Sequence, residues 1–210
     1  MVAVKRNSAR AEKTRQTRLR MLRAAEELFV ERGYGATPLQ DIADRAGVAV
    51  QTLYFAFGNK RTLLKEVVDT AVAGDDEPVA TMQRPWFREA LAATTAETLL
   101  RRHVAGVRKI LERVAPITEV LRVAAATDPD ISYLGAGDSD PRYLVQSAVA
   151  DALLTKPDAD TDLTAAEAAD TLYGLLSPEI YLTLVRDRGW PPERWERWTG
   201  DLLRGQLCRA

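Results

Sequence analysis

The chain has 210 residues, 46% of them hydrophobic, with a formal net charge of −1 at pH 7 and a single cysteine, Cys208. This composition allows a buried core in one large domain or in a small domain plus a larger one, and it excludes an internal disulfide. No apolar run approaches the roughly 20 residues that cross a bilayer, and the N-terminus lacks the apolar stretch of a secretion signal, so we expect a cytoplasmic protein without a membrane segment.

Basic charge is concentrated at the start of the chain. Residues 1–62 contain 12 Lys and Arg against 6 Asp and Glu, whereas the remainder contains 17 against 24. Within the first segment a basic cluster is opposed only by Glu12, and it comprises Lys5, Arg6, Arg10, Lys13, Arg15, Arg18 and Arg20. A basic segment joined to an acidic body is typical of a DNA-binding head. The cluster fits either an arm that contacts phosphates or the minor groove, or a solvated tail.

An apolar stripe predicts a first helix of roughly residues 17–32, ended by Gly33 and Gly35. A second helix begins after Thr37 and Pro38, because a hydroxyl can cap free backbone N–H groups and proline suits the first helical position. Its apolar face is formed by Leu39, Ile42, Ala43 and Ala46. Gly47 follows this face directly, at the place where a helix end favours a residue that tolerates positive φ.

A third short helix is expected to begin near Val50. Its outer side carries Gln51, Thr52 and Tyr54. Two short helices around a glycine turn, with polar side chains facing outward, are typical of a helix–turn–helix that places its second helix in the DNA major groove. A further helix of about residues 60–73 completes a compact four-helix unit.

Turn-forming residues at 73–78 place a domain boundary near residue 75, so we expect domains at 1–75 and 76–210. The second domain shows no strand-like alternation. Its expected helices cover about 86–93, 96–114, 116–126 and 142–154, with an interruption at Ala115–Pro116 and a long connection at 127–141. The fold class is therefore all-α: an N-terminal three-helix helix–turn–helix unit plus a linking helix, and a C-terminal helical domain.

The last two helices are predicted most clearly. Thr164 and Glu167 have the spacing of a capping box. The helix that they start is expected to kink, rather than end, at Ser177–Pro178, and Pro191–Pro192 begins a final helix. Both helices are apolar over more than one face. They either pack only within the chain or pair with the same helices of a second subunit as a four-helix bundle.

Matches in chain order between residues 24 and 64 resemble the signature of the tetracycline-repressor (TetR) family. They comprise the run Ala24–Tyr34, then Thr37, Ile42–Ala43, Ala46–Gly47–Val48, Thr52–Leu53–Tyr54, Phe57, Lys60 and Leu63–Leu64. The resemblance implies that an N-terminal domain binds double-stranded operator DNA as a homodimer, and that a divergent helical C-terminal domain binds a small effector and, through its last two helices, the partner subunit.

By this resemblance a set of residues at the N-terminal domain is expected to face DNA: Thr37, Val50, Gln51, Thr52, Tyr54, Phe55 and Lys60. Two positions depart from the family pattern. Ala49 stands where a serine cap is common, and Ala56 stands where a histidine often touches the DNA backbone. Backbone contacts are therefore expected to depend on Tyr54, Thr52 and Lys60.

An effector pocket is expected from a mixture of aromatic and polar side chains in the second half of the chain. The candidate residues are Trp86, Phe87, His103, Glu119, Arg122, Tyr143, Tyr173 and Tyr181. Each aromatic among them also fits ordinary helix packing.

No catalytic or metal site is predicted. A lone histidine and a lone cysteine far apart lack metal-ligand spacing, and no phosphate-binding loop or nucleophile–base pattern is present, so no cofactor is expected. Cys208, third from the C-terminus, is expected to be an incidental thiol at a frayed end.

The sequence thus indicates a ligand-responsive DNA-binding regulator, a repressor of a palindromic operator. The alternative is a helical small-molecule-binding protein or enzyme with a vestigial DNA-binding head.

Overall fold

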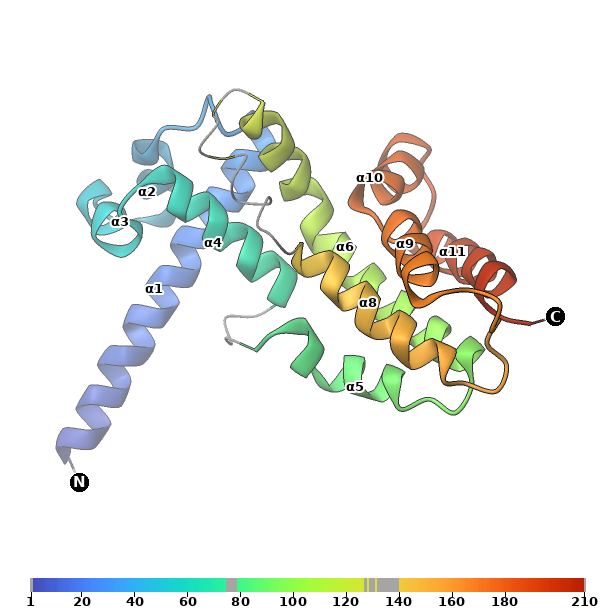
Figure 1. Cartoon of the computed structure of the whole chain (residues 1–210). Helices are drawn as coiled ribbons and strands as arrows, with labels where there is room; N and C mark the ends of the chain where they lie inside the picture. Colours follow the sequence, from blue (N-terminus) through green and yellow to red (C-terminus); the bar gives the residue numbers. More distant parts are fainter. Residues whose placement is uncertain (1, 75–78, 127, 129–130, 132–139, 210) are drawn as a thin grey trace. The chain divides into compact units, whose positions relative to one another are not determined.

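The computed structural model describes residues 2–74, 79–126, 128, 131 and 140–209, with side chains from residue 11 onward (Figure 1). In this part of the chain every regular element is helical, and the one strand-type pairing is an isolated bridge between Ala159 and Cys208. The elements are α1 (Val2–Arg32), α2 (Leu39–Ala46), α3 (Val50–Phe57), α4 (Lys60–Ala73), a 3-10 turn η1 (Thr81–Gln83), α5 (Pro85–Leu91), α6 (Ala96–Ala125), α8 (Pro141–Leu154), α9 (Ala165–Leu175), α10 (Pro178–Tyr181), a π-helical segment η2 (Leu182–Asp187) and α11 (Pro192–Leu207). The expected all-α class is confirmed.

None of the described helices is long and apolar enough to cross a membrane.

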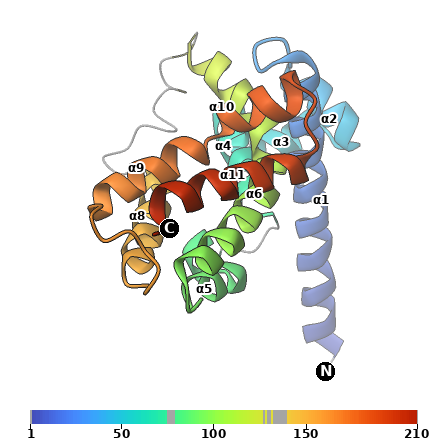
Figure 2. The ribbon, with the colours of Figure 1, turned by 90° about the vertical axis from the view of Figure 1, so that its right-hand side faces the viewer.

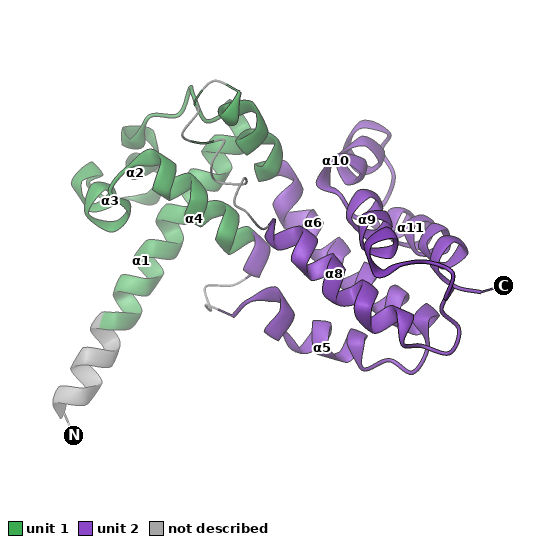
Figure 3. Ribbon diagram, viewed as in Figure 1, with its two compact units in different colours: residues 1–71, 117–134 green, residues 72–116, 135–210 purple. Residues whose placement is uncertain are grey.

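The chain divides into two compact units, which Figure 3 distinguishes by colour. Unit 1 comprises residues 1–71 and 117–134, and unit 2 comprises residues 72–116 and 135–210. The division falls within α6, directly after Pro116.

Unit 1 is built around the C-terminal half of α1, which packs against α2, while α2 packs against α3. Its largest fully buried side chains come from all four N-terminal helices and include Phe29, Ile42, Leu53 and Leu63. These helices are too short to bury an apolar face alone, so their stability depends on this shared core. The expected helix of residues 17–32 is longer than predicted, because no glycine or proline interrupts the chain between Val2 and Arg32.

In unit 2, α8 packs against α9, and α9 and α11 lie side by side (Figures 1 and 2). Trp195 of α11 is fully buried and its ring contacts Tyr181 edge-on at 5.1 Å between centroids. The inward side of α11 is formed by Trp195, Thr199, Leu203 and Leu207. An i, i+4 spacing of this kind places one narrow stripe of α11 in the core.

Two expected helix boundaries in unit 2 are wrong. The chain does not break at Ala115–Pro116, since α6 continues through Pro116 to Ala125. Pro116 removes only one helical hydrogen bond, and Ala115 and Ile117 on either side of it are fully buried. At Ser177 the expected kink is instead a true end: α9 stops at Leu175, and the Ser177 hydroxyl accepts the Ile180 N–H to cap a new helix, α10.

The C-terminal end of the described chain is held in place, contrary to the expected fraying. The backbone N–H of Asp160 donates to the Leu207 carbonyl oxygen at 3.0 Å, and that of Arg209 donates to the Asp158 carbonyl at 3.0 Å. Cys208 is half-buried, and burial raises the pKa of its thiol to about 11. Its thiol is therefore a weak nucleophile at neutral pH.

The predicted capping box of α9 is confirmed. The Glu167 N–H donates to the Thr164 hydroxyl at 3.2 Å, and the Thr164 N–H donates to a Glu167 carboxylate oxygen at 2.8 Å.

Replacing Thr164 with alanine is expected to lower the free energy of unfolding by about 1 kcal/mol, because it removes the acceptor for a free N–H at the start of α9. Urea denaturation followed by circular dichroism measures the change. Thr94→Ala, at an exposed threonine between α5 and α6, is the matched control. An equal loss in both variants would contradict a capping role.

Candidate nucleic-acid interface

The turn between α2 and α3 has the geometry that the sequence predicts. Gly47 lies in the left-handed region with φ 68° and ψ 41°. The Val48 N–H donates to the Ala43 carbonyl at 3.0 Å, and the Gly47 N–H donates to the Asp44 carbonyl at 3.2 Å. This pair of bonds is a Schellman motif, which satisfies the last carbonyl groups of α2 and reverses the chain into α3.

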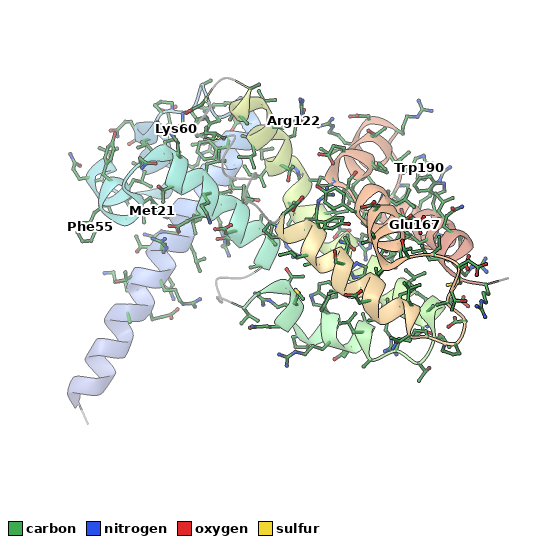
Figure 4. The ribbon with its side chains drawn as sticks, viewed as in Figure 1. Met21, Phe55, Lys60, Arg122, Glu167 and Trp190 are labelled. Atoms are coloured by element: carbon green, nitrogen blue, oxygen red, sulfur yellow. The ribbon has the colours of Figure 1, made fainter. Side chains whose placement is uncertain are left out.

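The helix α3 is divided into a buried and an exposed side. Leu53 and Phe57, four residues apart, are 1% and 5% exposed and anchor the helix in unit 1. The opposite side presents Gln51, Thr52, Tyr54 and Phe55 to solvent. Tyr54 is 53% exposed and Phe55 is 94% exposed, and Figure 4 shows Phe55 at the outer side of α3. Val50 is half-buried at the start of the helix.

The start of α3 lacks a side-chain cap. Ala49 occupies the N-cap position with φ −71° and ψ 145° and makes no side-chain hydrogen bond to the helix. The Thr52 N–H donates to the Ala49 carbonyl at 2.9 Å. The N–H groups of Val50 and Gln51 before it receive no side-chain cap and can face an anion, because a helix N-terminus favours negative charge.

Arg18 fixes the other end of α3 from the inside. Its guanidinium donates to the Ala56 carbonyl at 3.1 Å, pairs with Glu66 of α4, and lies 4.4 Å from the centroid of the Phe57 ring. A cation at a helix C-terminus also stabilises the helix dipole. Of the predicted basic cluster, Arg18 thus belongs to the structure of unit 1, Arg15 pairs with Glu12, and the side chains of Lys5, Arg6 and Arg10 lie outside the described residues.

Lys60, expected to hold the DNA backbone, has contacts within unit 1. Its ammonium group donates to the Tyr34 carbonyl oxygen and lies 4.3 Å from the centroid of the Tyr34 ring. Partial burial lowers the pKa of Lys60. In this structure Lys60 therefore connects the start of α4 to the loop before α2, and Figure 4 shows it there.

Thr37 is fully buried and does not cap α2. The N-cap position is Pro38, which makes no side-chain hydrogen bond, and the Thr37 hydroxyl is shared between the carbonyl oxygens of Gly33 at 2.8 Å and Leu28 at 3.2 Å. The cap prediction is wrong because the hydroxyl satisfies carbonyl groups at the end of α1 instead. Thr37 is therefore not part of the exposed surface.

The substitution Thr37→Val is expected to lower the free energy of unfolding by about 1 kcal/mol, because it removes a buried hydroxyl that donates to the Gly33 and Leu28 carbonyl oxygens. Guanidinium denaturation measures this quantity. Thr171→Val, which removes an exposed hydroxyl bound to the Glu167 carbonyl within α9, should change it by no more than about 0.5 kcal/mol. Similar values for both variants would show that the Thr37 bond is dispensable.

The same region matches known proteins. Residues 21–67 match the family model described as bacterial regulatory proteins, tetR family. The regulator TtgR of Pseudomonas putida is 39% identical over 59 residues, which cover 28% of this chain and 28% of TtgR, so this match spans less than a third of either protein. The repressor KstR2 of Mycobacterium tuberculosis is 26% identical over 195 residues, covering 89% of this chain and 84% of KstR2. Residues 21–67 therefore belong to the TetR family of bacterial regulatory proteins.

A solved structure shares the fold over most of the chain, its second half included. The regulator FadR from Bacillus subtilis, solved in complex with stearoyl-CoA, superposes with a TM-score of 0.66 at 18% identity, covering 88% of this chain and 96% of FadR.

The predicted effector residues fall into separate places. In unit 2, Trp86, Phe87 and His103 form one aromatic cluster, with ring centroids 5.6–6.2 Å apart. A second group contains Tyr143 and Tyr173, 5.5 Å apart, and Tyr181 packs on Trp195. Glu119 and Arg122 belong to the residues of unit 1 and pair with each other at 2.9 Å.

The two tyrosines of the second group are held by acidic side chains. The Tyr173 hydroxyl donates to Asp140 at 2.6 Å and the Tyr143 hydroxyl donates to Asp170 at 3.0 Å. Arg142 lies 3.6 Å from the centroid of the Tyr173 ring. With its polar groups paired in this way, this group fits a role in helix packing.

His103 differs from these residues. It is fully buried, and its ring Nε2 lies 2.9 Å from Gln146 Oε1. Burial lowers the pKa of His103 to about 4, so the ring is neutral at pH 7. Among the described residues its Nδ1 has no hydrogen-bond partner.

Sequence reasoning named Trp86 and Phe87 together with His103 but missed Gln146 and Gly106. Gln146 lies 43 positions away on α8, and the Trp86 indole lies flat on Gly106 of α6, where an added Cβ would be 2.3 Å from two ring carbons. A glycine within the long apolar helix α6 is the one local signal that could have indicated close approach of another group.

The part of the chain that the structure describes contains no group of three His, Cys, Asp or Glu side chains that could hold a metal ion.

Proposed function

We propose that the protein is a ligand-responsive transcriptional repressor that binds a palindromic operator as a homodimer. The exposed side of α3 carries this proposal: polar and aromatic side chains face solvent there, while Leu53 and Phe57 hold the helix from beneath. An exposed Phe55 has no role in the fold of a single chain, and it is well placed to contact the edges of bases.

In this proposal each subunit inserts α3 into a major groove. Gln51 and Thr52 contact base edges, Phe55 packs on base methyl groups, and the Tyr54 hydroxyl together with the uncapped N-terminus of α3 holds phosphates. Two such helices in a symmetric dimer read half-sites about 10 bp apart or a multiple of that distance.

The dimer is proposed to form through α9 and α11. The inward stripe of α11 leaves Trp198 half-buried and Leu202 36% exposed on an adjacent side. Gly174 of α9 and Gly200 of α11 have open space around them in the single chain, so another helix could approach closely. Light scattering should give twice the chain mass of 23.2 kDa, and a monomer at micromolar concentration would contradict the interface.

The effector is proposed to bind in unit 2, near Trp86, Phe87 and His103. FadR, which shares the fold, was solved with a small molecule bound. For derepression the effector must bind more tightly to the state that does not bind DNA. The helix α4, whose residues 60–71 belong to unit 1 and 72–73 to unit 2, is the element that we propose to transmit the change.

Selection from a randomised DNA library tests the operator. Purified protein is expected to enrich a palindrome, and binding to that sequence should weaken steeply with salt because phosphate contacts release counterions. If no sequence is enriched over random DNA, the proposal of a repressor is wrong.

The alternative, a helical small-molecule-binding protein or enzyme with a vestigial head, is the weaker interpretation. A vestigial head would not require an exposed Phe55 and Tyr54 beside intact anchoring residues. Our proposal includes no enzymatic step.

A further inference from the structure

The single histidine of the chain is buried in unit 2 with one ring nitrogen unused. Gln146 Oε1, a carbonyl oxygen, can only accept, so the bond of 2.9 Å to it requires that Nε2 carries the ring proton. Nδ1 is then a bare acceptor. It is fully buried, and it has no hydrogen-bond partner among the described residues.

An unpaired buried acceptor of this kind destabilises the folded state, and such groups are uncommon in folded proteins. Two apolar rings lie against His103: Phe87 meets its ring edge-on with centroids 6.0 Å apart, and Trp86 lies nearly parallel with centroids 6.2 Å apart. The lone pair is therefore available for a donor that none of the described residues supplies.

Trp86 is the neighbour of His103 whose side chain can move outward. It is half-buried, unlike Phe87, which is 1% exposed. The Trp86 indole lies directly on the backbone of Gly106, because glycine has no Cβ to keep the ring away. If the indole turned outward, it would leave a flat slot along α6, with Gly106 as its floor and His103 beside it. Such a slot has the thickness of one aromatic ring.

We propose that this slot is the effector site, and that it takes a small flat apolar molecule carrying one hydroxyl or N–H donor, which binds His103 Nδ1. This inference rests on the proposed function, because a ligand-responsive repressor needs a site for its effector. The molecule is expected to be flat because it takes the place of the Trp86 indole. It is expected to carry a donor because His103 Nδ1 is an unpaired acceptor among the described residues. The neutral state of the ring at pH 7 keeps the lone pair available.

The single histidine makes the test direct. Protein labelled with ¹⁵N-histidine gives one pair of ring nitrogen signals. Phenol and toluene are similar in shape, but only phenol has a donor. Titration with phenol is expected to shift the Nδ1 signal saturably, whereas toluene should leave the difference between Nδ1 and Nε2 unchanged.

Two variants and a control separate the slot from the donor bond. Trp86→Ala should bind both probes at least about tenfold more tightly, because the slot is then open. Trp190→Ala, which removes another half-buried tryptophan of unit 2, should leave the affinity for both probes unchanged. In His103→Phe the preference for phenol over toluene should fall about tenfold, the worth of one hydrogen bond to a buried acceptor. Circular dichroism checks that each variant remains helical.

The proposal is overturned if phenol leaves Nδ1 unmoved in both the wild type and Trp86→Ala. It is also overturned if phenol and toluene act alike on Nδ1, or if Trp190→Ala gains as much affinity as Trp86→Ala. These measurements need no DNA. A failure of the library selection would therefore remove the proposed repressor function without deciding the site, and a failure here would leave operator binding intact.

Discussion

Replacing Phe55 with alanine is expected to weaken operator binding by about tenfold to a hundredfold without changing the free energy of unfolding. The side chain is 94% exposed in the free protein, so its loss removes nothing from the core. Burying a phenylalanine at an interface contributes about 1.5–3 kcal/mol, which corresponds to this range in the dissociation constant.

Fluorescence anisotropy on the selected operator measures the change. In the major groove the apolar partner available to Phe55 is the C5-methyl group of thymine. Each thymine is therefore replaced in turn with uracil, which lacks this methyl group. At one position per half-site the replacement should weaken DNA binding by the wild type but not by Phe55→Ala. Leu144→Ala, which truncates a side chain of α8 that is 50% exposed, is the matched control. A Phe55→Ala protein that binds as tightly as the wild type would show that α3 docks on another side.

The helix–turn–helix was predictable because its signals are local. Gly47 ends α2 through bonds within six residues, and the spacing of Leu53 and Phe57 determines which side of α3 is buried. Exposure of Tyr54 follows from the same periodicity. The roles of Lys60 and Thr37 could not be read in this way. Lys60 binds Tyr34, 26 positions away, and Thr37 is turned inward to the carbonyl groups of Leu28 and Gly33, which the sequence pattern of a helix start does not indicate.

The second half of the chain was less predictable for a related reason. Proline signals at Pro116 and Pro178 are alike in sequence, but α6 continues through the first and α9 ends before the second. Ser177 supplies a cap for a new helix at the second site, whereas buried neighbours hold the helix together at the first. The pairing of His103 with Gln146 depends on how α6 and α8 pack, and no short spacing encodes it.

Acid is expected to destabilise the protein through His103 before it does so through carboxyl groups. The folded-state pKa of His103 is about 4, below its ordinary value of 6.5. Between these values the unfolded chain binds a proton that the folded chain does not, so stability falls as the pH falls from about 6.5 to about 4. The shift corresponds to a loss of about 3 kcal/mol across this window, and above pH 7 the group contributes no pH dependence.

Urea denaturation at several pH values between 7 and 4 measures this loss, with His103→Phe as the reference. Burial alone would raise the pKa values of Asp140 and Asp158, but hydrogen bonds to their carboxylates in the folded state outweigh it and lower both values. These groups therefore also favour unfolding in acid, but chiefly near and below pH 4. The difference between the two proteins therefore isolates the histidine. Parallel curves for wild type and variant between pH 7 and 5 would mean that His103 is not held neutral by burial.

The same titration bears on the ligand, because a proton and a hydroxyl donor compete for one lone pair on Nδ1. A donor bound there should lower the pKa of His103 further, and protonation should in turn expel the donor. Phenol is thus expected to protect the protein against urea more strongly at pH 7 than at pH 4.5, whereas any protection by toluene should be the same at both. Equal protection by phenol at the two pH values would place its binding away from Nδ1.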